Sequence, residues 1–275
     1  MSWTAQQRNM LAAMGLRVWA PPAPAAAAAE PQAAAAASAQ QRAPAFPQPR
    51  EAPPVPVPAP RAMAAPASPV AELDWSALRE AVAGCRACGL CTTRTQTVFG
   101  VGHPQAQWMV IGEAPGEQED LQGEPFVGAS GQLLDRMLAA LQLSRVDDDL
   151  APTTQRVFIA NTLKCRPPRN RNPTPEELQR CEPFLMRQIE LVRPRIILAM
   201  GAFAVKALLR TDQPVGRLRG QVHRYHGVPL VVTYHPAYLL RSLTDKARAW
   251  EDLCLAAQVA DEQAGDQPQA TAAQP

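Results

Sequence analysis

The sequence predicts an α/β protein: a three-layer α/β/α sandwich with helices on both faces of a central four-stranded parallel sheet. Three observations lead to this prediction. Short apolar runs have the length and composition of buried strands, stretches with helical spacing lie between them, and a polar residue or glycine follows each run. Strands that alternate with helices along a chain form parallel sheets, because each connecting helix crosses over one face of the sheet.

The predicted strands are the apolar runs 108–111, 157–160, 196–200 and 230–234. Their large apolar residues do not alternate with polar ones, as is typical of strands buried on both faces. The first run, WMVI, leads into the turn GEAPG (112–116), where two glycines and a proline bring backbone N–H groups close to whatever lies above the sheet. Because Glu117, Glu119 and Asp120 follow, the segment could also be an ordinary loop with solvated acids.

Five stretches have apolar residues at helical spacing and are predicted helices: 73–82, 129–141, 176–192, 202–209 and 245–259. The clearest start is that of 176–192. Thr174 is its predicted N-cap, Pro175 takes the first helical position, and Glu177 completes a capping box. The loop before it, 164–175, is rich in Arg, Asn and Pro.

A polar residue or glycine comes directly after every predicted strand: Gly112 with Glu113, then Asn161, Gly201 and His235. In a parallel sheet the carboxyl ends of the strands meet along one edge, and ligands bind in the crevice outside that edge. These residues are therefore predicted to converge on one cleft. The other histidines, His103, His223 and His226, fall in predicted loops and are expected at the surface.

Length and composition limit the classes of protein that fit this sequence. The 275 residues carry a net charge of +2 and are 47% hydrophobic, which is enough for one sizeable domain. No run of about 18 apolar residues predicts a membrane span. The first residues, MSWTAQQRNM, lack the basic-then-apolar pattern of a signal peptide, so we expect a cytoplasmic protein. In that compartment six cysteines are metal ligands or free thiols rather than disulfides.

The chain divides into four predicted parts. Residues 1–20 form a short docking peptide, 21–70 an Ala/Pro-rich disordered linker, 71–260 the folded domain, and 261–275 a disordered tail. The first part carries the pattern LxxMGLxVW, which resembles the N-terminal peptide of the psi subunit of the bacterial replicative clamp loader. That resemblance implies a clamp-loader partner for residues 1–20, while a frayed terminus is the alternative.

Four cysteines have the spacing of metal ligands: Cys85 and Cys88 form C-x2-C, and Cys165 and Cys181 form C-x15-C. Such a set suits either zinc or an iron–sulfur cluster, and spacing alone does not choose between them. Cys91 extends the first motif to C-x2-C-x2-C. If Cys91 were one of four metal ligands together with Cys85 and Cys88, only one of Cys165 and Cys181 would be needed as the fourth.

Five motifs in order resemble those of the family 4, iron–sulfur type, bacterial uracil-DNA glycosylases: GEAPGEQED, PFVG, the strand end at Asn161, KCRPPRNR and HPAYLLR. The resemblance runs from about residue 73 to residue 257. It implies the uracil-DNA glycosylase fold, a four-stranded parallel sheet sandwiched by helices. It also implies a structural [4Fe–4S] cluster bound by Cys85, Cys88, Cys165 and Cys181. Cys91 is then left with a structural role.

The resemblance implies a DNA repair enzyme that flips uracil out of single- or double-stranded DNA and hydrolyses its N-glycosidic bond, acting as a monomer. Phe126 would stack on the base. The side-chain amide of Asn161 can pair with uracil O4 and N3, a pattern that rejects cytosine. His235 would donate a hydrogen bond to uracil O2 and so stabilise the charge that develops as the bond breaks.

The same family pattern gives roles to other residues. Glu119 matches the motif carboxylate of the family and is expected to be catalytic, by orienting His235 and Asn170 and by helping to stabilise the cationic sugar. Ala114 stands where many other uracil-DNA glycosylases have the aspartate that positions water, so the water-activating group stays open. Gly116 stands where those enzymes have a bulky tyrosine that excludes thymine, so Phe126 and Glu113 are the expected substitutes.

Leu239, four residues after His235, matches the wedge that fills the vacated position in the base stack. The alternative is a leucine that packs its helix. Phosphate contacts are predicted for Arg241 and for the loop arginines Arg166, Arg169 and Arg171.

Two other functions fit parts of the sequence. One branch of the same superfamily binds uracil-containing DNA without turnover, by trapping itself on the abasic sugar through a basic loop that ends in histidine. The loop 166–175 contains no histidine, which disfavours this function. A zinc-containing nucleotide-binding α/β protein would need a phosphate loop, and GEAPG lacks the Lys and the Ser/Thr of that motif.

Overall fold

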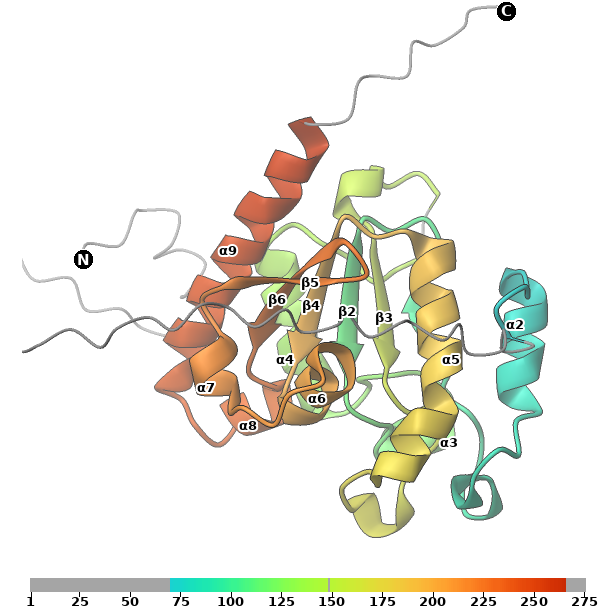
Figure 1. The fold of residues 1–275 in the computed structure, drawn as a ribbon. Helices are drawn as coiled ribbons and strands as arrows, with labels where there is room; N and C mark the ends of the chain where they lie inside the picture. Colours follow the sequence, from blue (N-terminus) through green and yellow to red (C-terminus); the bar gives the residue numbers. More distant parts are fainter. Residues whose placement is uncertain (1–69, 148, 266–275) are drawn as a thin grey trace, which may run out of the picture. The chain divides into compact units, whose positions relative to one another are not determined.

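The computed structural model describes residues 70–147 and 149–265, which form a three-layer α/β/α sandwich (Figure 1). Its sheet has the strand order β1-β3-β2-β4-β6-β5 within this part of the chain. The middle of the sheet consists of parallel strands: β3 (Val157–Asn161), β2 (Trp108–Gly112), β4 (Ile196–Met200) and β6 (Val228–Thr233). The predicted fold class and its parallel core are confirmed.

Two antiparallel edge strands were not predicted: β1 (Val101–Gly102) and β5 (Val222–Tyr225). β1 has only two residues, and β5 has a polar, largely exposed sequence that lacks the apolar pattern of the inner strands. β5 joins β6 through a hairpin turn in which His226 and Gly227 both have positive φ, 46° and 87°. This is the backbone of a tight type I′ hairpin, whose usual sequence signal is Asn-Gly rather than His-Gly.

Every second residue of the inner strands contacts the same helix layer, so both faces of the sheet are buried. Met109 and Ile111 face the layer made by α2 (Trp75–Ala83), α5 (Pro175–Val192) and α6 (Ala202–Leu209). Trp108 and Val110 face the layer made by α4 (Ala129–Ala140), α8 (Pro236–Leu239) and α9 (Asp245–Gly265). This double burial explains why the strands are continuous apolar runs.

The predicted helices occur at α2, α4, α5, α6 and α9. At the start of α5 the Glu177 N–H donates to Thr174 Oγ1 at 3.3 Å, and the Thr174 N–H donates to Glu177 Oε2 at 2.8 Å, which confirms the capping box. α9 runs to Gly265, past the predicted end at residue 259. No helix in the described ranges is long and apolar enough to cross a membrane.

The acidic segment after the GEAPG turn forms helix α3 (Glu117–Gln122). The sequence also fitted an ordinary loop with solvated acids at this place. Carboxylates in the first turn are favourable because they face the positive end of the helix dipole. Asp120 is buried, and its two carboxylate oxygens accept the Thr95 N–H at 3.1 and 2.9 Å. The remaining short elements are η1 (Gly89–Thr92), η2 (Thr153–Gln155), η3 (Pro168–Asn170) and α7 (Val215–Leu218).

The predicted docking peptide, the linker up to residue 69 and the last part of the predicted tail lie outside the described residues. The surface prediction was wrong for His103, and His223 lies in strand β5 rather than in a loop. His103 is buried, 4% exposed, because its ring lies between Asp149 and Arg156, with His103 Nε2 at 2.8 Å from Asp149 Oδ1 and 2.8 Å from Arg156 Nη1.

Candidate functional site

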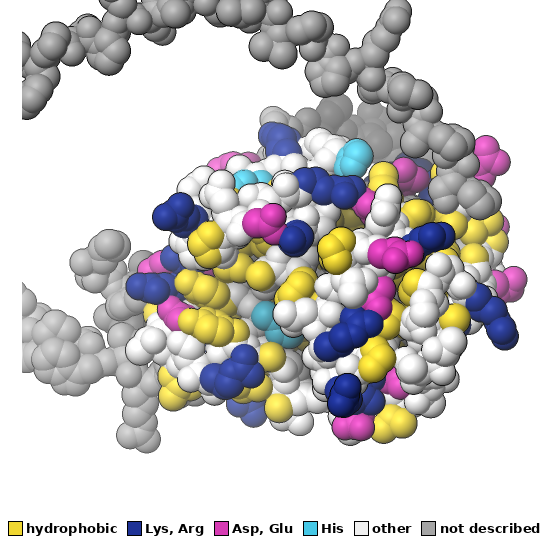
Figure 2. All heavy atoms as spheres, turned by 60° about the horizontal axis from the view of Figure 1, so that its bottom comes forward, with side chains coloured by type: hydrophobic (Ala, Val, Ile, Leu, Met, Phe, Trp, Pro, Cys, Tyr) yellow, Lys and Arg dark blue, Asp and Glu magenta, His cyan; other side chains and the backbone are white. Residues whose placement is uncertain are grey.

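A cleft of about 680 Å³ opens at the carboxyl ends of the parallel strands. All residues predicted to bind the base line this cleft: Glu113, Ala114, Gly116, Phe126, Asn161, Asn170 and His235. Figure 2 looks toward this end of the sheet and shows apolar side chains around the middle of the face, with Lys and Arg side chains spread around them. The convergence expected from the strand ends is therefore present in the structure.

His235 follows β6 and is the N-cap of α8. Its Nδ1 accepts a hydrogen bond from the Ala237 N–H at 3.1 Å. Burial lowers the pKa of His235 to about 4, although the charge of Glu119 acts in the opposite direction. The imidazole is therefore neutral at neutral pH, and because Nδ1 is an acceptor, the proton is on Nε2. Nε2–H is therefore able to donate a hydrogen bond to an oxygen.

Phe126 and Asn161 meet at Gly112, the last residue of β2. The Phe126 and His235 rings are stacked, with centroids 5.4 Å apart. Gly112 pairs with Asn161 across the sheet. A Cβ atom on Gly112 would lie 2.5 Å from Asn161 Oδ1 and 2.6 Å from Phe126 Cζ, closer than atoms can approach. The absence of a side chain at Gly112 therefore leaves the space that both side chains occupy.

Phe126 has a left-handed backbone, with φ of 56°. For a residue other than glycine this conformation costs roughly 1–2 kcal/mol. It persists only where the surroundings hold it. The ring itself is buried, 5% exposed.

Glu113 follows Gly112 at the end of β2, and burial raises the pKa of its carboxyl to about 7. Its backbone is fixed to the neighbouring strand, because the Glu113 carbonyl accepts from the Leu163 N–H at 3.1 Å and from Thr162 Oγ1 at 2.5 Å. Near neutral pH this side chain can therefore be either a hydrogen-bond donor or a carboxylate.

Glu119 lines the cleft, but its hydrogen bonds go to backbone N–H groups rather than to the side chains it was expected to orient. Its Oε2 accepts from the Gly116 N–H at 3.1 Å and its Oε1 accepts from the Val127 N–H at 3.2 Å. In the described part of the chain, neither oxygen bonds His235 or Asn170. The reason is its place in the first turn of α3, from which it reaches back to the GEAPG turn and across to the backbone after Phe126.

The loop after β3 brings Asn170 and one of its arginines to the cleft. Asn170 Oδ1 accepts from Arg166 Nε at 2.8 Å, so Arg166 supports the cleft wall without lining it. Arg171 lines the cleft, but its guanidinium donates to both Glu177 oxygens, at 2.9 and 2.5 Å. This partner lowers the pKa of Glu177 to about 2. Arg169 is exposed and has no place in the cleft lining.

The position of Leu239 contradicts its predicted role as a wedge. Its side chain is 0% exposed and packs in the core between α4 and α9, because α8 is a single turn whose inner face Leu239 occupies. The next residue, Leu240, is 43% exposed, and Arg241, for which a phosphate contact was predicted, lines the cleft.

Sequence reasoning missed two tyrosines of the cleft, Tyr234 and Tyr238. Their rings are stacked, with centroids 5.1 Å apart. Tyr234 immediately precedes His235 at a strand end, and Tyr238 lies in the HPAYLLR motif, so their positions were the available signal.

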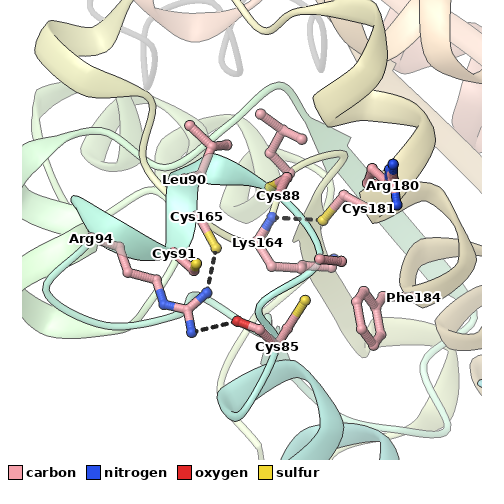
Figure 3. A pocket seen from close by; sticks show the side chains of 12 residues that line it. Cys85, Cys88, Leu90, Cys91, Arg94, Lys164, Cys165, Arg180, Cys181 and Phe184 are labelled. Carbon is pink, nitrogen blue, oxygen red and sulfur yellow. Dashed lines mark hydrogen bonds between the residues drawn. The ribbon is translucent and has the colours of Figure 1, made fainter.

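A second pocket, away from the cleft, is lined by five cysteines (Figure 3): Cys85, Cys88, Cys91, Cys165 and Cys181. Two N–H groups point at its sulfur atoms. Arg94 Nη1 donates to Cys165 Sγ at 3.0 Å, and the Lys164 backbone N–H donates to Cys181 Sγ at 3.3 Å. No group of His, Cys, Asp or Glu side chains within 70–147 and 149–265 is arranged to hold a single metal ion in this structure.

The donor set nevertheless fits an iron–sulfur cluster. Cysteine sulfurs with N–H donors in an apolar pocket are the usual surroundings of such clusters. Burial raises the pKa of the Cys181 thiol to about 12 and also raises that of Cys165, so neither is a thiolate on its own, and coordination to iron would deprotonate them. The pocket also includes Cys91, which was predicted to have only a structural role.

The cysteine pocket and the cleft share one backbone segment, 161–165. Lys164 is buried, and its Nζ donates to the Asn161 carbonyl at 2.9 Å and to Gln188 Oε1 at 2.6 Å. Asn161, the last residue of β3, is thus tied to the segment that carries Cys165.

The fold and the two sites together define a protein of the uracil-DNA glycosylase class. Comparison with known proteins agrees: residues 99–254 match the model of the Uracil DNA glycosylase superfamily. The chain therefore belongs to this superfamily and, by the similarities that follow, to its type-4 family.

Type-4 uracil-DNA glycosylases are similar over most of the domain. The protein of Archaeoglobus fulgidus is 42% identical over 167 residues, which are 58% of this chain and 79% of that protein. The protein of Pyrobaculum aerophilum is 39% identical over 191 residues, which are 66% of this chain and 93% of that protein. A type-5 uracil-DNA glycosylase of the same organism is 36% identical over 146 residues, which are 50% of this chain and 64% of that protein.

Proposed function

We propose that the protein removes uracil from DNA by hydrolysing its N-glycosidic bond, leaving an abasic site for base excision repair of deaminated cytosine. The observation that carries this proposal is the meeting of Phe126, Asn161 and His235 in one cleft, from separate segments of the chain. A flipped base needs a flat apolar contact, an edge reader and a donor for its developing charge. These three side chains supply one each.

Base recognition follows from the chemistry of the first two residues. The Phe126 ring offers a face for stacking, and the Asn161 amide offers one donor and one acceptor for uracil O4 and N3. Cytosine presents the reverse pattern at those positions and would leave the buried Asn161 amide with mismatched partners. Such a mismatch is costly because Asn161 is only 3% exposed.

Bond cleavage depends on the departure of uracil as an anion, whose charge grows on O2. The neutral His235 can donate its Nε2–H to that oxygen without a change of protonation state. A fixed donor in a water-poor site stabilises the transition state more than the ground state. Ala114 and Gly116 line the cleft without a polar side chain, so Glu113 is the carboxylate of the GEAPG turn that faces the site.

Excision from an oligonucleotide with a single uracil, read by alkaline strand cleavage, tests this function. We expect multiple turnover by the native protein, and a loss of about 10²–10³ in kcat for His235→Ala, the usual effect of removing a charge-stabilising donor. Asn161→Ala should also lose most activity. His223→Ala is the matched control, because His223 bonds the Leu218 carbonyl away from the cleft and should leave kcat unchanged. Retention on uracil-containing DNA without release of free uracil would instead support the non-turnover binding function.

We propose that Leu240, rather than Leu239, fills the gap left by the flipped base. Leu240→Ala should lower excision from double-stranded DNA by about tenfold and affect single-stranded DNA much less, because only a duplex has a stack to fill. Leu239→Ala should lower stability by about 2–5 kcal/mol through the cavity it leaves, seen as a lower Tm. Equal loss on both substrates for Leu240→Ala would contradict the assignment.

We propose that Cys85, Cys88, Cys165 and Cys181 bind a [4Fe–4S] cluster, which would hold the segment before β1 against the β3–α5 loop without taking part in the reaction. The purified protein should be brown, with broad visible absorption and bound iron and sulfide. Cys165→Ala should lose this absorption, whereas Cys91→Ala and Cys254→Ala should keep it. Zinc without iron in the purified protein would overturn the proposal.

We propose further that the protein acts as a monomer in the cytoplasm and that residues 1–20 dock on a subunit of the replicative clamp loader. Deletion of residues 1–20 should leave excision unchanged and abolish co-purification with clamp-loader subunits, since the described residues that line the cleft fall between 113 and 241. Co-purification that persists after the deletion would exclude this partner site.

A further inference from the structure

Phe126 occupies a backbone conformation that needs support. Its φ is 56°, while its ring lies in the cleft stacked on His235. Residues other than glycine leave this region unless their neighbours hold them there. The position of the Phe126 ring therefore depends on the contacts that hold the backbone of residues 125–127.

Arg145 holds the carbonyls on both sides of the Phe126 N–Cα bond. Its Nη1 donates to the Pro125 carbonyl at 2.8 Å and its Nη2 donates to the Phe126 carbonyl at 3.0 Å. The same guanidinium is fixed by Asp135 on α4, whose Oδ1 accepts from Arg145 Nε at 2.7 Å. The Arg145 side chain is only 15% exposed, so water competes poorly for these bonds.

The backbone of Phe126 also lies against α4. A Cβ atom on Gly131 would lie 1.7 Å from the Phe126 carbonyl oxygen, so only glycine permits this approach. On the other side, Glu119 accepts the Val127 N–H at 3.2 Å. Residues 125–127 are therefore held from several sides. Arg145, Gly131 and Glu119 contact their backbone, and Gly112 lies against the Phe126 ring.

We propose that Arg145 is a positioning residue for the reaction: it clamps the Pro125 and Phe126 carbonyls and so fixes the Phe126 ring at the place where uracil stacks. Arg145 itself is not among the described residues that line the cleft, and it acts only through Phe126. A planar guanidinium suits the task, because its fork of N–H groups reaches two carbonyls at fixed geometry, which the single ammonium of lysine does not. The inference rests on the proposed stacking role of Phe126.

Without the clamp, the backbone at Phe126 should relax from positive φ and the ring should leave its place. A small displacement of a group that positions the substrate can cost about 100-fold in rate. We therefore expect Arg145→Met to lower kcat/KM for uracil excision by about 10–100-fold. Arg145→Lys keeps the charge and one carbonyl bond, and it should recover only a small part of the loss.

A double-mutant cycle with Phe126→Ala separates positioning from general stability. If Arg145 acts through Phe126, the Arg145→Met/Phe126→Ala protein should have the same kcat/KM as Phe126→Ala alone, within about twofold. The matched control is Arg156→Met. Arg156 is a buried arginine that, like Arg145, donates to backbone carbonyls, at 2.8 Å to Ala151 and 2.5 Å to Asp149, but at the other end of the sheet. Its effect on kcat/KM should be small and additive with Phe126→Ala.

Additive effects of Arg145→Met and Phe126→Ala, or an unchanged kcat/KM in Arg145→Met, would overturn the inference. Where Arg145→Met does not fold, the cycle is run with Arg145→Lys, and the Tm of each variant is measured alongside. Measuring the native protein distinguishes the two proposals. If the native protein does not release uracil, the proposed function is wrong. If it does, but the effects of the two substitutions on kcat/KM are additive, only the role of Arg145 is wrong.

Discussion

The cleft depends on the missing side chain at Gly112. Two side chains with different tasks, the Phe126 ring and the Asn161 amide, come from different segments and share the space beside the last residue of β2. Any side chain at this position would displace one of them. Because the parallel register places Gly112 directly beside Asn161, the sheet itself brings the Asn161 amide next to the Phe126 ring.

From this point the supporting contacts extend outward in two directions. Toward α4, the backbone around Phe126 is held by Arg145, Gly131 and Glu119. Toward α5, the Asn161 carbonyl is held by the buried Lys164, whose own N–H donates to Cys181 Sγ. The cysteine pocket and the cleft are thus connected through residues 161–165 of the β3–α5 loop.

Much of this arrangement could be predicted from the sequence, because the inner strands are buried on both faces and so appear as continuous apolar runs. Residues that follow such runs, Asn161 and His235 among them, are brought together by any parallel sheet, whatever its details. The edge strand β5 could not be found in this way, since one of its sides faces solvent and its sequence, VHRY, carries no apolar pattern. α3 was missed because its acids also fit a solvated loop.

Contacts to backbone atoms were the hardest to predict. The role of Arg145 could not be predicted, because its partners are backbone carbonyl groups, which every residue has and no sequence motif marks. Leu239 and Leu240 are adjacent leucines of one motif, and only the packing of a single helical turn determines which of them is buried. The expectation for Glu119 came from resemblance, and its hydrogen bonds to the Gly116 and Val127 N–H groups were not predicted.

A crystal structure of the protein with free uracil, the product of the proposed reaction, tests the account most directly. It should show the base stacked on Phe126, with its O4 and N3 edge at the Asn161 amide and its O2 within hydrogen-bond distance of His235 Nε2. Uracil bound elsewhere, or in the cleft with O2 directed away from His235, would contradict the roles assigned to these three residues.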